Sequence, residues 1–141
     1  MSPRDTGTGA VLEKMILPSL TRGGYSFQKQ VNIGERFGGG KHKVDILAKD
    51  RKGKEILVSL KWQGESGTAE QKVPFEAMCL AEAILSGRGI YEKAYLVLGG
   101  EGWKLREFFI AGGLKRHLKY DYLVSIMSLE AFVTKANKGE L

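Results

Sequence analysis

Residues 44–47 read Val-Asp-Ile-Leu, and residues 56–63 read Ile-Leu-Val-Ser-Leu-Lys-Trp-Gln. In each run a charged side chain, Asp45 or Lys61, interrupts a pattern of apolar residues that is typical of a buried strand. The polar turn at 49–53 lies between the two runs and predicts a hairpin. A hairpin of this kind places Asp45 beside the second strand and its lysine.

Strand side chains alternate between the two faces of a sheet, so Ser59, Lys61 and Gln63 share one face and the apolar residues between them share the other. A lysine or an aspartate buried without a partner would cost several kcal/mol after relaxation. The two charges must therefore pair, reach an opening or bind a metal. A structural Asp45–Lys61 ion pair is the simplest of these alternatives.

Apolar periodicity predicts the elements around this hairpin. We expect helices over 8–17, 73–87, 103–110 and 128–137, the first ended by Pro18 and the last capped by Ser128, and strands over 25–33, 43–48, 55–63, 94–98 and 122–127. The order is αβββαβ followed by αβα. It predicts an α/β fold in which helices flank a mixed central sheet, built as a single domain over 1–141 with its core at about 8–127.

The composition narrows the class of protein. The chain has 141 residues, 22 basic and 16 acidic side chains, and a formal net charge of +6, so phosphate polyanions are plausible partners. The single Cys79 excludes an intramolecular disulfide and a multi-cysteine zinc site, and we expect its thiol to be buried.

We expect His42 and His117 to be solvated. With no signal core and no apolar run of about 18 residues, the sequence suggests a soluble cytoplasmic protein with no membrane partner.

Two further carboxylates are expected to join the hairpin charges. Glu13 has apolar neighbours at helical spacing, which predicts that it points inward. Glu76 is expected in the first turn of the helix that follows Lys61, where a carboxylate that only complements the helix dipole is the alternative. The polar, glycine-bearing segment 62–72 is expected to be a loop that lines the site, although a plain surface loop is equally allowed.

The order of these acidic and basic residues resembles the PD-(D/E)XK nuclease superfamily, which has the restriction-endonuclease-like fold. The resemblance covers roughly residues 8–98. It implies that Asp45 is the motif aspartate, Lys61 the motif lysine and Glu13 the accessory acid of the first helix. Gln63, two residues beyond the lysine, resembles a glutamine found after this motif in branches of the family.

The sequence departs from the family pattern at two positions. Val44 replaces the proline before the aspartate, and Ser59 stands where the acidic residue of the D/E-x-K triplet is expected. Some restriction enzymes similarly have Ser-x-Lys and a glutamate that has migrated to the following helix. Glu76, fifteen residues after Lys61, is the corresponding candidate here.

The resemblance implies a Mg²⁺-dependent DNA endonuclease, with Mn²⁺ able to substitute. Asp45, Glu76 and Glu13 would be metal ligands, and Lys61, Ser59 and Gln63 further members of the catalytic site. Restriction, homing, junction resolution and phage-type degradation all stay open, and small size favours a homodimer acting on double-stranded or branched DNA. The alternatives are an inactive nuclease-fold module that binds nucleic acid, and an α/β domain unrelated to nucleic acid. The residues expected to contact phosphates are Lys41, Lys43, Lys115, Arg116 and Lys119.

Overall fold

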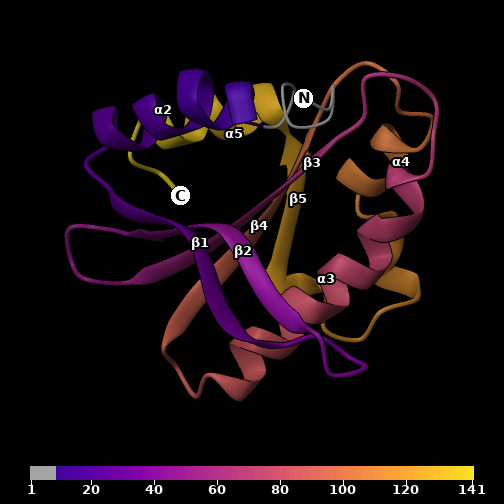
Figure 1. Ribbon diagram of the computed structural model, residues 1–141, viewed down its shortest axis with the longest axis horizontal. Helices are drawn as coiled ribbons and strands as arrows, with labels where there is room; N and C mark the ends of the chain where they lie inside the picture. The colour runs from indigo at the N-terminus through magenta and orange to yellow at the C-terminus, as the bar shows by residue number, and fades with distance from the viewer. Residues whose placement is uncertain (1–8) are drawn as a thin grey trace.

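A computed structural model describes residues 9–141 and shows a five-stranded sheet with helices on both faces (Figure 1). The strands lie in the order in which they occur along the chain: β1 (Ser26–Glu35), β2 (Lys41–Lys49), β3 (Glu55–Trp62), β4 (Tyr91–Gly99) and β5 (Val124–Ser128). The first three pair antiparallel, whereas β4 runs parallel to β3 and β5 parallel to β4. The sheet is therefore mixed, as predicted.

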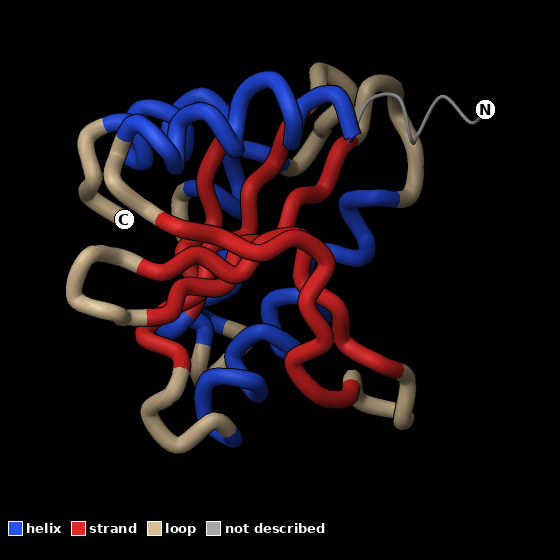
Figure 2. Tube along the Cα trace, turned by 60° about the vertical axis from the view of Figure 1, so that its left-hand side comes forward, coloured by secondary structure: helices blue, strands red, loops and turns tan. Residues whose placement is uncertain are grey.

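The helices form two layers around this sheet (Figures 1 and 2). On one face lie α2 (Leu17–Arg22), preceded by the π-helical turn η1 (Leu12–Ile16), and α5 (Leu129–Asn137). On the other lie α3 (Ala69–Ser86), α4 (Arg106–Ile110) and the 3₁₀ turns η2 (Gly113–Arg116) and η3 (Asp121–Leu123). The predicted α/β class and the αβββαβ order are confirmed.

Each helical layer encloses its own apolar core against the sheet. The α2/α5 core holds Ile16, Leu20, Val58, Tyr95 and Phe132, among others, and the rings of Tyr95 and Phe132 meet edge to face with centroids 5.5 Å apart. The α3/α4 core holds Leu57, Leu80, Leu96, Leu98 and Phe109, among others. Because β3 and β4 contribute side chains to both cores, they are the buried centre of the sheet.

The first helix is longer than its sequence suggests, because Pro18 does not end it. Helical backbone runs over 9–22 and contains the π turn, in which the Leu17 N–H donates to the carbonyl of Leu12. Pro18 follows this π turn directly, at the beginning of the α-helical segment α2, so the helix continues through it. The prediction that the helix stops at residue 17 is therefore wrong.

The helix after β3 begins at Ala69, before the predicted start, and contains Pro74 in its interior. The early turn is held by a tertiary contact, since the Glu70 carboxylate accepts the N–H groups of Lys104 and Leu105. Glu70, and not Glu76, is thus the acidic residue of the first turn. The predicted helix over 103–110 shortens to α4. The predicted cap of α5 is confirmed, because Ser128 Oγ accepts from Ala131 N–H at 3.1 Å.

The side chains of β2 stop alternating regularly between the two faces of the sheet at Asp45. Val44 and Leu47 both pack in the α3/α4 core, although three residues apart on a regular strand would put them on opposite faces. Ile46, between them, packs in the α2/α5 core. On β1, Gln30 has a φ of 53° and is skipped by the ladder opposite Asp45. The irregularity lies at the residue that the sequence marks as functional.

No helix in residues 9–141 is long and apolar enough to cross a membrane.

Candidate active site

Strands β2 and β3 part at Asp45. Their pairing runs from Lys49 opposite Glu55 to Ile46 opposite Val58. At the next position a side-chain carboxylate replaces the backbone carbonyl as the acceptor from β3. Asp45 Oδ2 accepts the N–H of Leu60 at 2.6 Å. The carboxylate therefore occupies the gap where the two strands diverge, directly against the backbone that carries Lys61.

The Asp45 carboxyl group is poorly stabilised as an anion. Burial raises its pKa above the ordinary value of 3.8, and nearby Glu76 raises it further. The Leu60 N–H, the charge of Lys61 and the amide of Gln30, whose Nε2 lies 3.4 Å from Oδ1, lower it without compensating fully. A partly buried carboxylate with a raised pKa beside a lysine marks a candidate functional site.

Glu76 lies on the α3 face of the sheet, buried to 1% exposure, in a trio with Arg36 and His42. Its Oε1 accepts a hydrogen bond from Arg36, and its Oε2 lies 3.1 Å from His42 Nε2. His42 is itself only 1% exposed, so the expectation that it is solvated is wrong. The second strand turns this histidine inward because it shares the α3/α4 core face with Val44.

The trio keeps Glu76 ionised. Burial raises the pKa of this carboxyl group, but the hydrogen bonds from His42 and Arg36 and the charge of Lys61 outweigh burial and lower it to about 2. Lys61 thus lowers the pKa of both Asp45 and Glu76. Asp45, Glu76 and Lys61 therefore influence one another electrostatically.

We expect Glu76 to stabilise the fold at neutral pH and to lose that contribution in acid. Because its pKa is lower in the folded chain than its ordinary 4.5, its contribution is full above about pH 5 and is lost as the pH falls through about 2. The shift corresponds to about 3 kcal/mol. Urea unfolding at pH 5 and pH 2 measures how much free energy of unfolding each protein loses in acid. Glu76→Gln should lose less of it than the wild type. The matched control is Glu13→Gln, which should lose as much as the wild type; equal losses in all three proteins would contradict the expectation.

Lys61 lines an open groove at the end of β3. The groove has a volume of about 750 Å³ and is bordered by residues 60–65, by Thr68 in the loop, and by Ala69 and Lys72 at the start of α3. Lys61 is half-buried and Lys72 is exposed. The loop over 63–68 therefore lines a cavity beside the candidate site, as predicted, whereas residues 69–72 belong to α3.

Gln63 is buried on the loop side of β3, where it joins the end of the strand to the segment after β4. Its Nε2 donates to the Gly102 carbonyl at 2.8 Å, and its backbone N–H donates to the Gly99 carbonyl at 3.0 Å. The buried Oε1 has no hydrogen-bond partner among the described residues. These contacts give Gln63 a structural role in the loop.

Gly100 provides a test of this junction. It has a φ of +95°, and a Cβ added there would lie 2.3 Å from the Gln63 carbonyl oxygen. Gly38 has a similar φ of +97°, but a Cβ there would meet nothing within 4 Å. We expect Gly38→Ala to cost about 1–2 kcal/mol from the backbone alone, and Gly100→Ala to cost at least about 2 kcal/mol more. Urea unfolding measures both, and equal losses would contradict the close contact.

Glu13 does not point inward, and that expectation is wrong. Its side chain is 60% exposed and pairs with Lys29 of β1 at 2.8 Å. The reason is the π turn that contains it, since the wider turn removes the three- and four-residue spacing on which the prediction rested. Ser59, in contrast, is buried at 4% exposure on β3, on the strand face that carries Lys61.

The remaining candidates lie on the surface, apart from the cysteine. The five predicted phosphate contacts, Lys41, Lys43, Lys115, Arg116 and Lys119, are all exposed. His117 is exposed as well, and Cys79 is buried as predicted. Sequence reasoning missed Arg36 and the inward side chain of His42. The sequence does carry a signal for an inward His42, because His42 continues the every-second-residue pattern of the apolar residues Val44 and Ile46.

A family model described as a PD-(D/E)XK nuclease superfamily domain matches residues 4–140. The chain belongs to this superfamily, whose name and fold are those of nucleases. Among solved structures, the chain is similar to AF1548, a protein of unknown function, with 12% identity and a TM-score of 0.45 over 80% of this chain and 54% of that one. The chain thus spans about half of that protein. No curated protein matches it.

Proposed function

We propose that this protein is a metal-dependent DNA endonuclease whose catalytic centre is formed by Asp45, Lys61 and Glu76. The observation that carries the proposal is the desolvated Asp45 carboxylate at the fork between β2 and β3, within the electrostatic reach of Lys61. A carboxylate that folding disfavours as an anion is well suited to bind a cation, and the superfamily generally uses divalent metals.

The donor set fits a Mg²⁺-like ion with few protein ligands. Residues 9–141 contain no group of three or more His, Cys, Asp and Glu side chains that could hold a metal by themselves. Mg²⁺ is commonly bound through one or two carboxylates together with water and substrate phosphate. Asp45 and Glu76 would hold it, and Mn²⁺ could replace it. When bound, the ion polarises the phosphoryl group and lowers the pKa of a bound water.

The chain's own residues would prepare the site for hydrolysis. Lys61 would neutralise the negative charge that develops on the phosphate, and its charge lowers the pKa of both carboxyl groups. Arg36 and His42 would orient Glu76 by occupying one oxygen each. Ser59 would contribute at most a hydrogen bond from its hydroxyl, in place of the acidic residue of the family triplet. Glu13 forms an ion pair with Lys29 of β1. To act as the proposed accessory acid, its carboxylate would have to leave Lys29 and turn toward the metal.

DNA is the proposed substrate because the protein carries a net charge of +6 and exposes Lys41, Lys43, Lys115, Arg116 and Lys119. Such residues bind phosphates without reading base sequence. A homodimer would allow each copy to cut one strand of a duplex or a junction.

The test is incubation of the purified protein with plasmid and branched DNA in Mg²⁺, Mn²⁺ or EDTA. Nicking or linearisation that needs the metal supports the proposal. Binding without cleavage of any DNA form in either metal would refute it and favour an inactive nuclease-fold module, a reading prompted by Ser59 in the acidic position. Light scattering with and without DNA tests the dimer.

A further inference from the structure

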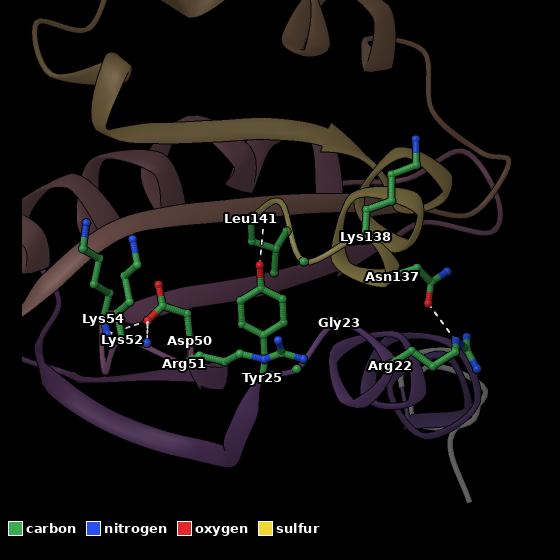
Figure 3. A pocket seen from close by; sticks show the side chains of 12 residues that line it. Arg22, Gly23, Tyr25, Asp50, Arg51, Lys52, Lys54, Asn137, Lys138 and Leu141 are labelled. Carbon is green, nitrogen blue, oxygen red and sulfur yellow. Dashed lines mark hydrogen bonds between the residues drawn. The ribbon is translucent and has the colours of Figure 1, made fainter.

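A second basic site lies at the end of the molecule formed by the β2–β3 turn. It is a pocket of about 460 Å³. Three segments line it: residues 22–25, residues 50–52 with Lys54, and residues 137–139 with Leu141 (Figure 3). Figure 3 shows Lys52 and Lys54 on one side of the Tyr25 ring and Arg22 and Lys138 on the other.

The side chains around this pocket have a strong excess of positive charge. The basic residues that line it are Arg22, Arg51, Lys52, Lys54 and Lys138, against Asp50 as the one acidic residue, which gives +4. Asp50 is committed to the turn, because its Oδ1 accepts the backbone N–H groups of Lys52 and Lys54 at 2.8 and 2.9 Å. Most of the chain's net charge of +6 is therefore gathered here.

The C-terminal ends of two helices offset only part of this positive charge. The C-termini of α2 and α5 meet the pocket at Gly23 and Lys138, and each end carries roughly half a negative charge. These ends offset about one of the four positive charges. The excess at the pocket remains positive.

Four of the five basic side chains have no acidic partner among residues 9–141, because Asn137, the partner of Arg22, is neutral. Arg22 Nε donates to Asn137 Oδ1 at 2.8 Å, and Lys54 Nζ lies 3.6 Å from the exposed Glu92. Arg51, Lys52 and Lys138 form no ion pair with any residue of 9–141, and all three are exposed.

The pocket is better suited to phosphate groups than to bases. Its one aromatic side chain, Tyr25, is buried, and its hydroxyl accepts the Leu141 N–H at 2.9 Å. No exposed ring is thus present in the lining on which a base could stack. The guanidinium of Arg51 packs over Gly24, where an added Cβ would lie 2.6 Å from Nε. This contact orients Arg51 along the pocket.

We propose that this pocket is a DNA-backbone contact separate from the catalytic centre, in which Arg51 and Lys52 bind phosphates. The inference rests on the proposed function for the identity of the polyanion. Asp50 lies five residues after Asp45 along β2 and its turn, which is about 16 Å at the rise of a β-strand. Substitutions in the pocket therefore leave the catalytic side chains untouched.

The experiment measures binding of a short labelled DNA duplex in EDTA over a range of salt concentrations. For Arg51→Ala/Lys52→Ala, we expect weaker binding and a smaller dependence on salt. The slope of log K against log salt concentration should fall by about two, because each lost phosphate contact lowers that slope by about one. The matched control is Lys14→Ala/Arg88→Ala, which removes the same charge from exposed positions outside the pocket. Its slope should equal that of the wild type.

An unchanged slope in the pocket variant, or an equal fall in the control, would overturn the proposal. A larger loss with an RNA duplex than with DNA would overturn the assignment to DNA. The two proposals can fail separately. Wild-type protein that never cleaves but shows the pocket-dependent slope refutes only the endonuclease, whereas cleavage by a wild type whose pocket variant binds normally refutes only the pocket. Thermal melts confirm that each variant is folded.

Discussion

Asp45→Asn is expected to abolish metal-dependent cleavage while the protein still binds DNA in EDTA. The substitution removes the charge that would hold the cation but keeps an oxygen that can accept the Leu60 N–H. A metal contributes several kcal/mol to stabilising the transition state, and each 1.36 kcal/mol is tenfold in rate, so the loss should be about a thousandfold or more. Single-turnover cleavage beside a binding titration measures the two effects.

The same variant should be no less stable than the wild type. Because burial raises the pKa of Asp45, its ionised form disfavours folding, so this group favours the fold below its ordinary pKa and loses that effect as the pH rises through the folded value. At neutral pH, removing the charge relieves the cost. A thermal melt should show an equal or higher Tm. Undiminished cleavage by folded Asp45→Asn would refute this active site.

Lys61→Met is expected to lower kcat by about 10²–10³, with a smaller effect on binding. The ammonium group would act on charge that is larger in the transition state than in the bound substrate, so its loss appears mainly in kcat. Methionine retains the length of the aliphatic chain against the groove. Steady-state or single-turnover rates over a range of DNA concentrations separate the two parameters.

Lys72→Met is the matched control for Lys61, because the two lysines line the same groove but only Lys61 influences the carboxylates. We expect Lys72→Met to weaken binding and to leave kcat nearly unchanged. If both variants lost kcat equally, the effect would belong to the positive groove as a whole, and the specific role of Lys61 would be contradicted.

The hairpin that carries Asp45 and Lys61 could be predicted because it depends on local signals. Alternation, a polar turn and two isolated charges lie within 20 residues, 44–63. The contact between Asp45 and Leu60 N–H is a direct result of strand pairing that begins at the turn. The overall order of elements follows from similar short-range periodicity.

The partners of Glu76 could not be predicted in the same way. His42 and Arg36 are 34 and 40 residues from Glu76, and their contact depends on how α3 packs across the sheet. Glu13 was misplaced for a different reason, because a π turn is not visible in apolar spacing. Glu70 likewise takes its role from amides of Lys104 and Leu105, which only the tertiary fold brings near.

The fork at Asp45 restricts how this position could change during evolution. One carboxylate oxygen replaces a rung of the β2–β3 ladder, so an aliphatic replacement would leave the Leu60 N–H without an acceptor in a part-buried setting. In a descendant released from selection for cleavage, aspartate should therefore drift first to residues that retain an acceptor, such as asparagine. The sheet itself would preserve a trace of the active site after its chemistry had been lost.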